Sequence, residues 1–132
     1  MEGRLIFPRL GLRSDLSFLV DTGADQTMIH PLDGTRMGID YPALTDVAES
    51  IGVGGISRNF IEPAVAVFAE PRRNLYVYNI QVAVCPPSPD IMDLPSLLGR
   101  DILDNWRMTY SPQQRRLVFK VLVADATIDL SA

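Results

Sequence analysis

The stretch FLVDTGADQTMI, residues 18–29, places a carboxylate where an apolar strand would otherwise enter the core. A buried acid is costly unless it is hydrogen-bonded or takes part in chemistry. Gly23 permits a tight turn directly after the strand, and the small side chain of Ala24 leaves room for close approach to the backbone. Thr22 adds a hydroxyl that can fix the local geometry. We therefore expect Asp21 at a strand end, held in place at the edge of the core.

The size and composition of the chain indicate one folded domain spanning residues 1–132. With 132 residues and 47% apolar residues, the chain can bury a single hydrophobic core. The net charge is −4 and the basic residues are scattered, which argues against nucleic-acid binding. No apolar run approaches 18 residues, so we expect no membrane span.

The single cysteine and single histidine limit the chemistry further. Cys85 cannot form an internal disulfide, so a reducing compartment is the simplest fit and we expect a cytoplasmic protein. One Cys and one His also argue against a zinc site, and no metal or other cofactor is expected. Cys85 could be a nucleophile, but its position at the end of an apolar run favours a packed side chain. His30 could serve as a base, although its place before Pro31 favours a surface or capping role.

The pattern along the chain is mostly that of short strands. Apolar or alternating segments predict a hairpin near the N-terminus, a second hairpin with its turn at 70–74, and a strand near the C-terminus. These segments are RLIFPRL (4–10), LSFLV (16–20), AVAVFA (64–69), LYVYNIQVAV (75–84) and RLVFKVLV (116–123). The total of six or seven strands predicts a small barrel or sandwich.

Two short helices are expected between these strands. The first lies within HPLDGTRMGI, residues 30–39, with Pro near its start and Gly38 near its end, although Gly34 weakens the pattern. The second lies within GRDILDNW, residues 99–106, where Ile102, Leu103 and Trp106 would share one stripe. Four prolines make residues 85–95 a loop.

Two further stretches resemble parts of a binding site. IGVGGISRNF, residues 51–60, has dense glycines between apolar residues, which suits a mobile hairpin tip over a ligand. Glycine-rich hairpins also occur without any such role. LLGRDIL, residues 97–103, repeats the logic of FLVDTGA, residues 18–24: an apolar strand, then a glycine, then a sharp change of direction.

In this order, FLVDTGA, the glycine-rich hairpin, LLGRDIL and the closing strand RRLVF resemble the retropepsins. These are the single-domain aspartic proteases of the retroviral type, and the resemblance runs from about residue 5 to about residue 121. It implies a mostly β fold, a small closed barrel of the retropepsin-like acid protease type with one or two short helices. It also implies an endopeptidase that acts as a homodimer on an extended polypeptide.

The resemblance assigns roles to individual residues of the site. Asp21 would be catalytic, Thr22 would tie two active-site loops together at the dimer axis, and Gly23 would offer its carbonyl to the substrate. Asp25 and Arg100 would form an ion pair that braces the site. Ala24 and Gly99 would support the same loops. The flap and pocket wall would comprise Ile51, Gly52, Val53, Gly54, Gly55, Ile56, Ile91 and Leu98.

The number of carboxylates sets the expected assembly. The mechanism needs two carboxylates that share one proton, one as base on a water and one as acid toward the carbonyl. The chain has one DTG, and Asp101 lies at a helix start, so the second carboxylate would be Asp21 of another copy. The stretch before the glycine-rich hairpin is longer than is usual in the family, and residues 122–132 do not match the viral tail, so the interface stays unassigned.

Two other classes of protein remain possible from the sequence. One is a retropepsin-fold module that binds peptides or mediates dimerisation without hydrolysis. The other is a plain β-barrel in which the DTG occurs by chance. The ordered motifs favour the protease over both.

Overall fold

The computed structural model describes residues 1–52 and 55–131, with the backbone alone for residues 50–52 and 55. Within these ranges the chain forms eleven strands, two short α-helices and two single-turn 3-10 helices. The strands are β1 (Glu2–Phe7), β2 (Leu12–Ser17), β3 (Leu19–Val20), β4 (Met28–Ile29), β5 (Val47–Gly52), β6 (Gly55–Glu70), β7 (Asn74–Val84), β8 (Leu97–Leu98), β9 (Trp106–Ser111), β10 (Arg116–Val121) and β11 (Ala126–Asp129). The helices are α1 (Pro31–Arg36), η1 (Tyr41–Ala43), η2 (Pro89–Ile91) and α2 (Arg100–Leu103).

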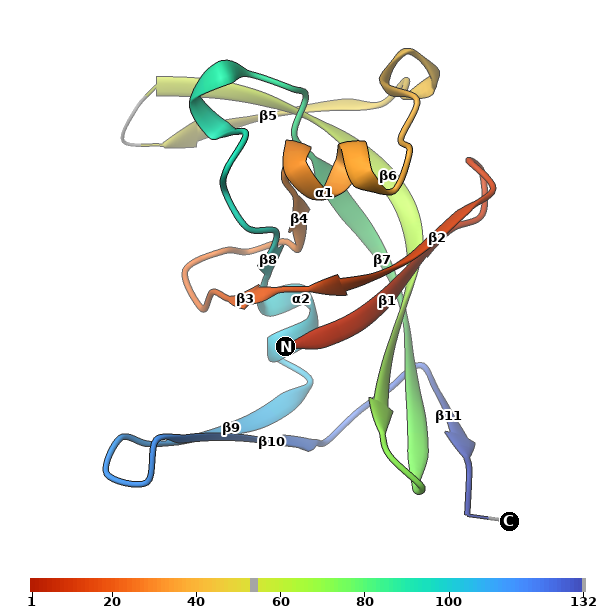
Figure 1. Cartoon of the computed structure of the whole chain (residues 1–132), viewed down its shortest axis with the longest axis vertical. Helices are drawn as coiled ribbons and strands as arrows, with labels where there is room; N and C mark the ends of the chain where they lie inside the picture. The colour runs from red at the N-terminus through yellow and green to blue at the C-terminus, as the bar shows by residue number, and fades with distance from the viewer. Residues whose placement is uncertain (53–54, 132) are drawn as a thin grey trace.

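A long hairpin of β6 and β7 forms the centre of the sheet (Figure 1). Its strands pair in register from Phe60 with Val84 to Glu70 with Asn74. One end of β6 pairs with β5 and the other end pairs with β1, which in turn pairs with β2. Both expected hairpins are therefore present, and the strand expected at 64–69 is the second half of a much longer strand.

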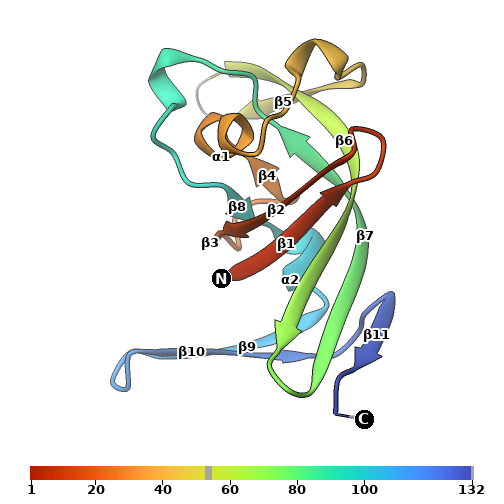
Figure 2. The same cartoon turned by 45° about the vertical axis from the view of Figure 1, so that its right-hand side comes forward.

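The other edge of the sheet brings together the segments around the two glycine motifs. β4 runs parallel to the end of β7 and antiparallel to β8, and β8 runs parallel to β3. The sheet thus follows the order β2-β1-β6-β7-β4-β8-β3 and curls into a half-barrel (Figures 1 and 2). The mostly β fold predicted from the sequence is confirmed. More strands form than predicted because β3, β4 and β8 have two residues each, too few to show a period.

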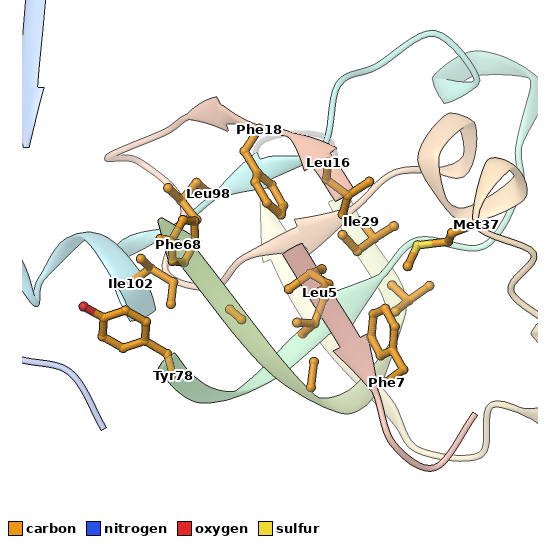
Figure 3. Close-up of a cluster of buried hydrophobic side chains, with 14 of the residues drawn as sticks. Leu5, Phe7, Leu16, Phe18, Ile29, Met37, Phe68, Tyr78, Leu98 and Ile102 are labelled. Carbon is orange, nitrogen blue, oxygen red and sulfur yellow. The ribbon is translucent and has the colours of Figure 1, made fainter. Parts of the chain in front are cut away.

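Buried apolar side chains from both halves of the sheet form one core (Figure 3). Leu16 and Phe18, two positions apart in the predicted strand 16–20, are 5% and 4% exposed, so both face the core. The side chains labelled in Figure 3 are Leu5, Phe7, Leu16, Phe18, Ile29, Met37, Phe68, Tyr78, Leu98 and Ile102. Because Leu98 and Ile102 belong to this core, the LLGRDIL segment is anchored from beneath.

Helix α1 lies within the expected range and ends by a Schellman motif. The amide of Gly38 donates to Thr35 O at 3.1 Å and that of Ile39 to Gly34 O at 3.0 Å. Gly38 has φ +82°, the left-handed conformation that this motif requires. Gly34, which weakened the sequence prediction, packs against Tyr41, and a Cβ there would force the Tyr41 hydroxyl to move.

The second helix is shorter than the sequence predicted. α2 ends at Leu103, and Trp106 begins strand β9 instead of continuing a helical stripe. Trp106 is still buried, with 7% exposure, and its indole packs edge-on against Phe68 and Phe119 at 4.9 and 5.3 Å between ring centroids. The prediction that Trp106 shares a helical stripe with Ile102 was wrong. Two buried residues four positions apart can lie on one helix, but they can equally lie on either side of a turn, as Ile102 and Trp106 do.

Candidate active site

The loop after β3 holds Asp21 by its backbone and by its own side chain. The amide of Asp21 donates to Leu98 O at 3.0 Å, which ties the residue to β8. The amide of Gly23 donates to Asp21 Oδ1 at 2.9 Å, and that of Ala24 donates to Asp21 O at 3.2 Å. The Asp21 side chain is partly exposed, at the end of the strand. This geometry fixes the carboxylate while leaving it open to a reactant.

The loop after β8 packs directly against the Asp21 loop. The amide of Arg100 donates to Ala24 O at 2.8 Å, and the amide of Asp101 donates to Asp25 O at 3.2 Å. Gly99 is required by this contact, since a Cβ there would lie 2.5 Å from the carbonyl carbon of Gln26. The two segments that the sequence singled out are therefore in contact, and one glycine makes that contact possible.

An ion pair joins the same two loops at the surface. The guanidinium of Arg100 contacts the carboxylate of Asp25, as the resemblance implied. Their side chains are 48% and 84% exposed, so the pair contributes at most about 1 kcal/mol to stability. Its effect is to align the loops rather than to hold the fold.

A pair between the buried Thr27 and the partly buried Asp101 was missed by the sequence reasoning. The carboxylate of Asp101 accepts from Thr27 N at 3.0 Å, from Thr27 Oγ1 at 2.7 Å and from Ile102 N at 3.0 Å. Thr27 Oγ1 in turn accepts from Gly99 N at 3.2 Å, and Thr27 is fully buried. The available signal was a Thr six residues after Asp21, directly before the apolar residues Met28 and Ile29, where a buried hydroxyl needs a partner.

This arrangement also decides the role of Asp101. Its two oxygens are occupied by Thr27 and by the first turn of α2. Asp101 is therefore a structural acid and not a second carboxylate for Asp21, in agreement with the sequence prediction.

The residues assigned to the loop tip, the hairpin and the pocket wall lie in different environments. Thr22 and Gly23 are exposed at the tip of the Asp21 loop. Of the hairpin residues, Ile51 pairs with Ile56 and Gly52 with Gly55 through the backbone, and the side chain of Ile56 is 68% exposed. Val53 and Gly54 lie outside the described residues.

The two pocket-wall residues differ in burial. Ile91 is half-buried in η2, on the loop that runs beside the β5–β6 hairpin in Figures 1 and 2. Leu98 is fully buried in the core. Leu98 therefore contacts the site through its carbonyl, which accepts from the Asp21 amide.

The side chains that could support another hydrolytic mechanism are held in structural roles. His30 is 7% exposed, and its Nδ1 lies 2.6 Å from Pro95 O. Cys85 is 8% exposed, its thiol donates to Asn59 Oδ1 at 3.1 Å, and burial raises its pKa. A buried thiol with a raised pKa forms little thiolate at neutral pH, so Cys85 is a packed residue, as predicted. The sequence predicted a surface or capping role for His30: the residue is buried and not at the surface, but it is the N-cap residue of α1, although its side chain makes no capping hydrogen bond.

The described ranges, 1–52 and 55–131, lack two further features that would bear on function. His, Cys, Asp and Glu side chains do not gather there in groups of three that could hold a metal ion. No helix there has the length and apolar content needed to cross a membrane.

The curled sheet and the paired DTGA and LLGRD loops define a retropepsin-like domain. A family model described as retroviral aspartyl protease matches residues 8–110, and the chain belongs to this family. Among solved structures, the chain is similar to a retropepsin-like aspartic protease from Rickettsia conorii, with a TM-score of 0.57 and 20% identity over 90% of this chain and 89% of that chain. Comparison with curated protein sequences gives no match.

Proposed function

We propose that this chain is an aspartic endopeptidase in which Asp21 is the catalytic residue. The observation that carries the proposal is the state of that carboxylate: it is fixed by the Gly23 amide and partly exposed on a loop that a second loop braces. A catalytic group must be held in position before substrate arrives, because misplacement lowers the rate steeply. Residues 1–132 would act as one domain.

The enzyme is proposed to be a homodimer because one chain supplies half of the required chemistry. The sequence contains a single DTG, and the carboxylate of Asp101 is engaged with Thr27. The second carboxylate then comes from Asp21 of another copy, across a two-fold axis. Two carboxylates held this close share one proton, so that one can act as base on a water while the other donates to the scissile carbonyl.

The β9–β10 hairpin offers a surface for that second copy. Its register pairs Trp106 with Val121, Met108 with Phe119 and Tyr110 with Leu117, so that these six apolar side chains share one face. The opposite face carries Arg107 paired with Lys120 and Ser111 paired with Arg116. We call the first set the apolar face of the hairpin.

Only the root of this apolar face is covered by the chain's own core. Trp106 is 7% exposed, whereas Met108, Leu117 and Tyr110 are 41%, 42% and 69% exposed. In both Figure 1 and Figure 2 the tip of the hairpin projects to the same side of the molecule as the loop that follows β3. An uncharged, exposed face can meet its own copy without repulsion between like charges, while the opposite face, which carries three cations, cannot.

The substrate is proposed to lie extended between the Asp21 loop and the β5–β6 hairpin. Backbone groups of an extended peptide can pair with strand-like segments, and alternate side chains then enter apolar pockets. Residues 51–56 and Ile91 would contribute to these contacts.

The test is cleavage of a peptide library at several pH values by the wild type and by Asp21→Asn. We expect products from the wild type and none from Asp21→Asn, with the same mass in solution for both. Asp104→Asn, at an exposed acid in the turn directly after α2, is the matched control and should cleave normally. Cleavage that persists in Asp21→Asn would reject the proposal, and a wild type that binds peptides without releasing products would identify a binding module.

A further inference from the structure

A buried carboxylate lies at the point where β6 changes partner. β5 pairs with β6 as far as Phe60, and β1 pairs with β6 from Val65 to Val67. Glu62 falls in the interval between these partners, and it shares the inward-facing register of Ala64, which is 4% exposed. Glu62 itself is 1% exposed. A charge at such a position is strongly destabilising unless it is paired.

The partner of Glu62 comes from the turn between β1 and β2. Arg9 Nε lies 3.1 and 3.0 Å from the two carboxylate oxygens of Glu62, and Nη2 lies 2.6 Å from Oε1. The same Nη2 donates to Ala43 O at 2.9 Å. Ala43 belongs to η1, just before β5 begins. One guanidinium therefore joins β6 to the segment that leads into β5, at the base of the β5–β6 hairpin.

The strand pairing on that edge of β6 is interrupted at the base of this hairpin. Between the β5 and β1 pairings, the amide of Ile61 donates to Asp46 O at 2.9 Å, and Pro63 has no amide to donate. A continuous strand whose edge partners stop and start again can bend at the interval. The Arg9 contacts span that interval from outside the sheet.

We propose that Arg9 is a positioning residue that sets the angle of the β5–β6 hairpin relative to the Asp21 loop, acting through Glu62 and Ala43. The inference rests on the proposed function where it concerns substrate, because a hairpin that lies over the substrate must be held at a productive angle. In the free protein, loss of the Arg9 contacts lets β5 and the first part of β6 open more often and leaves the β1–β2 hairpin unchanged.

The test compares Arg9→Met with the double variant Arg9→Met/Glu62→Met. Arg9→Met leaves Glu62 buried and unpaired, so its stability falls. The double variant removes the charge as well, and replacing a buried ion pair by apolar residues of similar volume is often neutral for stability. The control is Arg4→Met, which breaks the exposed Arg4–Asp15 pair on the same β1–β2 hairpin.

Two measurements are made on each variant. Amide hydrogen exchange reports opening of residues 47–49 and 56–60 against that of β1 and β2. For the double variant, at wild-type stability, we expect exchange in the first set to rise about tenfold while β1 and β2 are unchanged. Peptide cleavage should show KM raised about tenfold with kcat within twofold, since binding under the hairpin is weakened rather than the chemistry. Arg4→Met should match the wild type in both.

Each result decides the inference. If the double variant recovers wild-type exchange and KM along with stability, Arg9 only neutralises a buried charge and the positioning role is wrong. If Arg9→Met does not fold, the double variant carries the test alone. If the wild type cleaves no peptide, the proposed function fails, and the exchange data still decide whether Arg9 holds the hairpin.

Discussion

Replacing Asp101 by Ala removes the acceptor that joins the two loops of the site. Thr27 N and Thr27 Oγ1 lose contacts of 3.0 and 2.7 Å, and Ile102 N loses one of 3.0 Å. Thr27 is fully buried, so its two donors would lose the protein acceptor that now satisfies them. Asp101→Asn keeps the shape of the side chain but turns an amide group toward one of these donors.

The expected loss follows from the number of orphaned donors. A buried donor without a partner costs about 1–3 kcal/mol, so two give about 2–6 kcal/mol. Because the Asp101 side chain is only partly buried, water can reach its side of the gap. We therefore expect a loss near the lower half of that range, about 3 kcal/mol for Asp101→Ala and about half as much for Asp101→Asn.

The assay is urea unfolding followed by circular dichroism, with all variants at one protein concentration. Equal concentration is required because association with a second copy would shift the apparent stability. Asp104→Ala, an exposed substitution in the turn directly after the same helix, is the control and should change the free energy of unfolding by less than about 0.5 kcal/mol. If Asp101→Ala loses no more than Asp104→Ala, the view that Asp101 and Thr27 join the loops is refuted.

Two further predictions concern the hairpin and an internal tyrosine. Leu117→Lys puts a charge on the apolar face of the hairpin and should weaken self-association at least about tenfold in sedimentation equilibrium. Val118→Lys, on the opposite face with similar exposure, should leave self-association unchanged. Equal effects of the two variants would exclude the apolar face as the contact between copies. The hydroxyl of Tyr78 donates to Val123 O at 2.7 Å and accepts from Trp106 Nε1 at 2.8 Å, and burial raises its pKa. Tyr78→Phe should cost about 1 kcal/mol at neutral pH. The difference in stability between the two proteins should shrink as pH rises from about 10 through the higher pKa of folded Tyr78, because unfolded Tyr78 loses its proton first and the variant has no phenol to titrate. A difference that stays constant up to about pH 11 in unfolding experiments would contradict this.

The sequence was most informative where one residue type serves one purpose. Gly99 and Gly23 marked sharp turns, and the glycine at 99 proves necessary because the backbone at Gln26 lies against it. The order of DTGA and LLGRD predicted two loops of similar design, and the pairing of β3 with β8 brings them together. Motifs of this kind are short and local, so they can be recognised in the sequence without knowledge of the fold.

The features that the sequence missed depend on contacts between distant segments. Thr27 and Asp101 are 74 positions apart, and nothing near either residue indicates the other. Glu62 has the spacing of a buried position but the charge of a surface one, and only Arg9, 53 positions away, resolves that conflict. Trp106 could close a helical stripe or open a strand, and the turn at residues 104–105 decides between them.

The half-covered apolar face of the β9–β10 hairpin has a consequence for control of the proposed enzyme. A single protomer would have one carboxylate of the dyad and an exposed apolar face. Association with a second copy would complete the dyad and bury that face. Activity would then grow with the square of protein abundance when copies are scarce, so that synthesis, dilution or local crowding could govern proteolysis without any added effector.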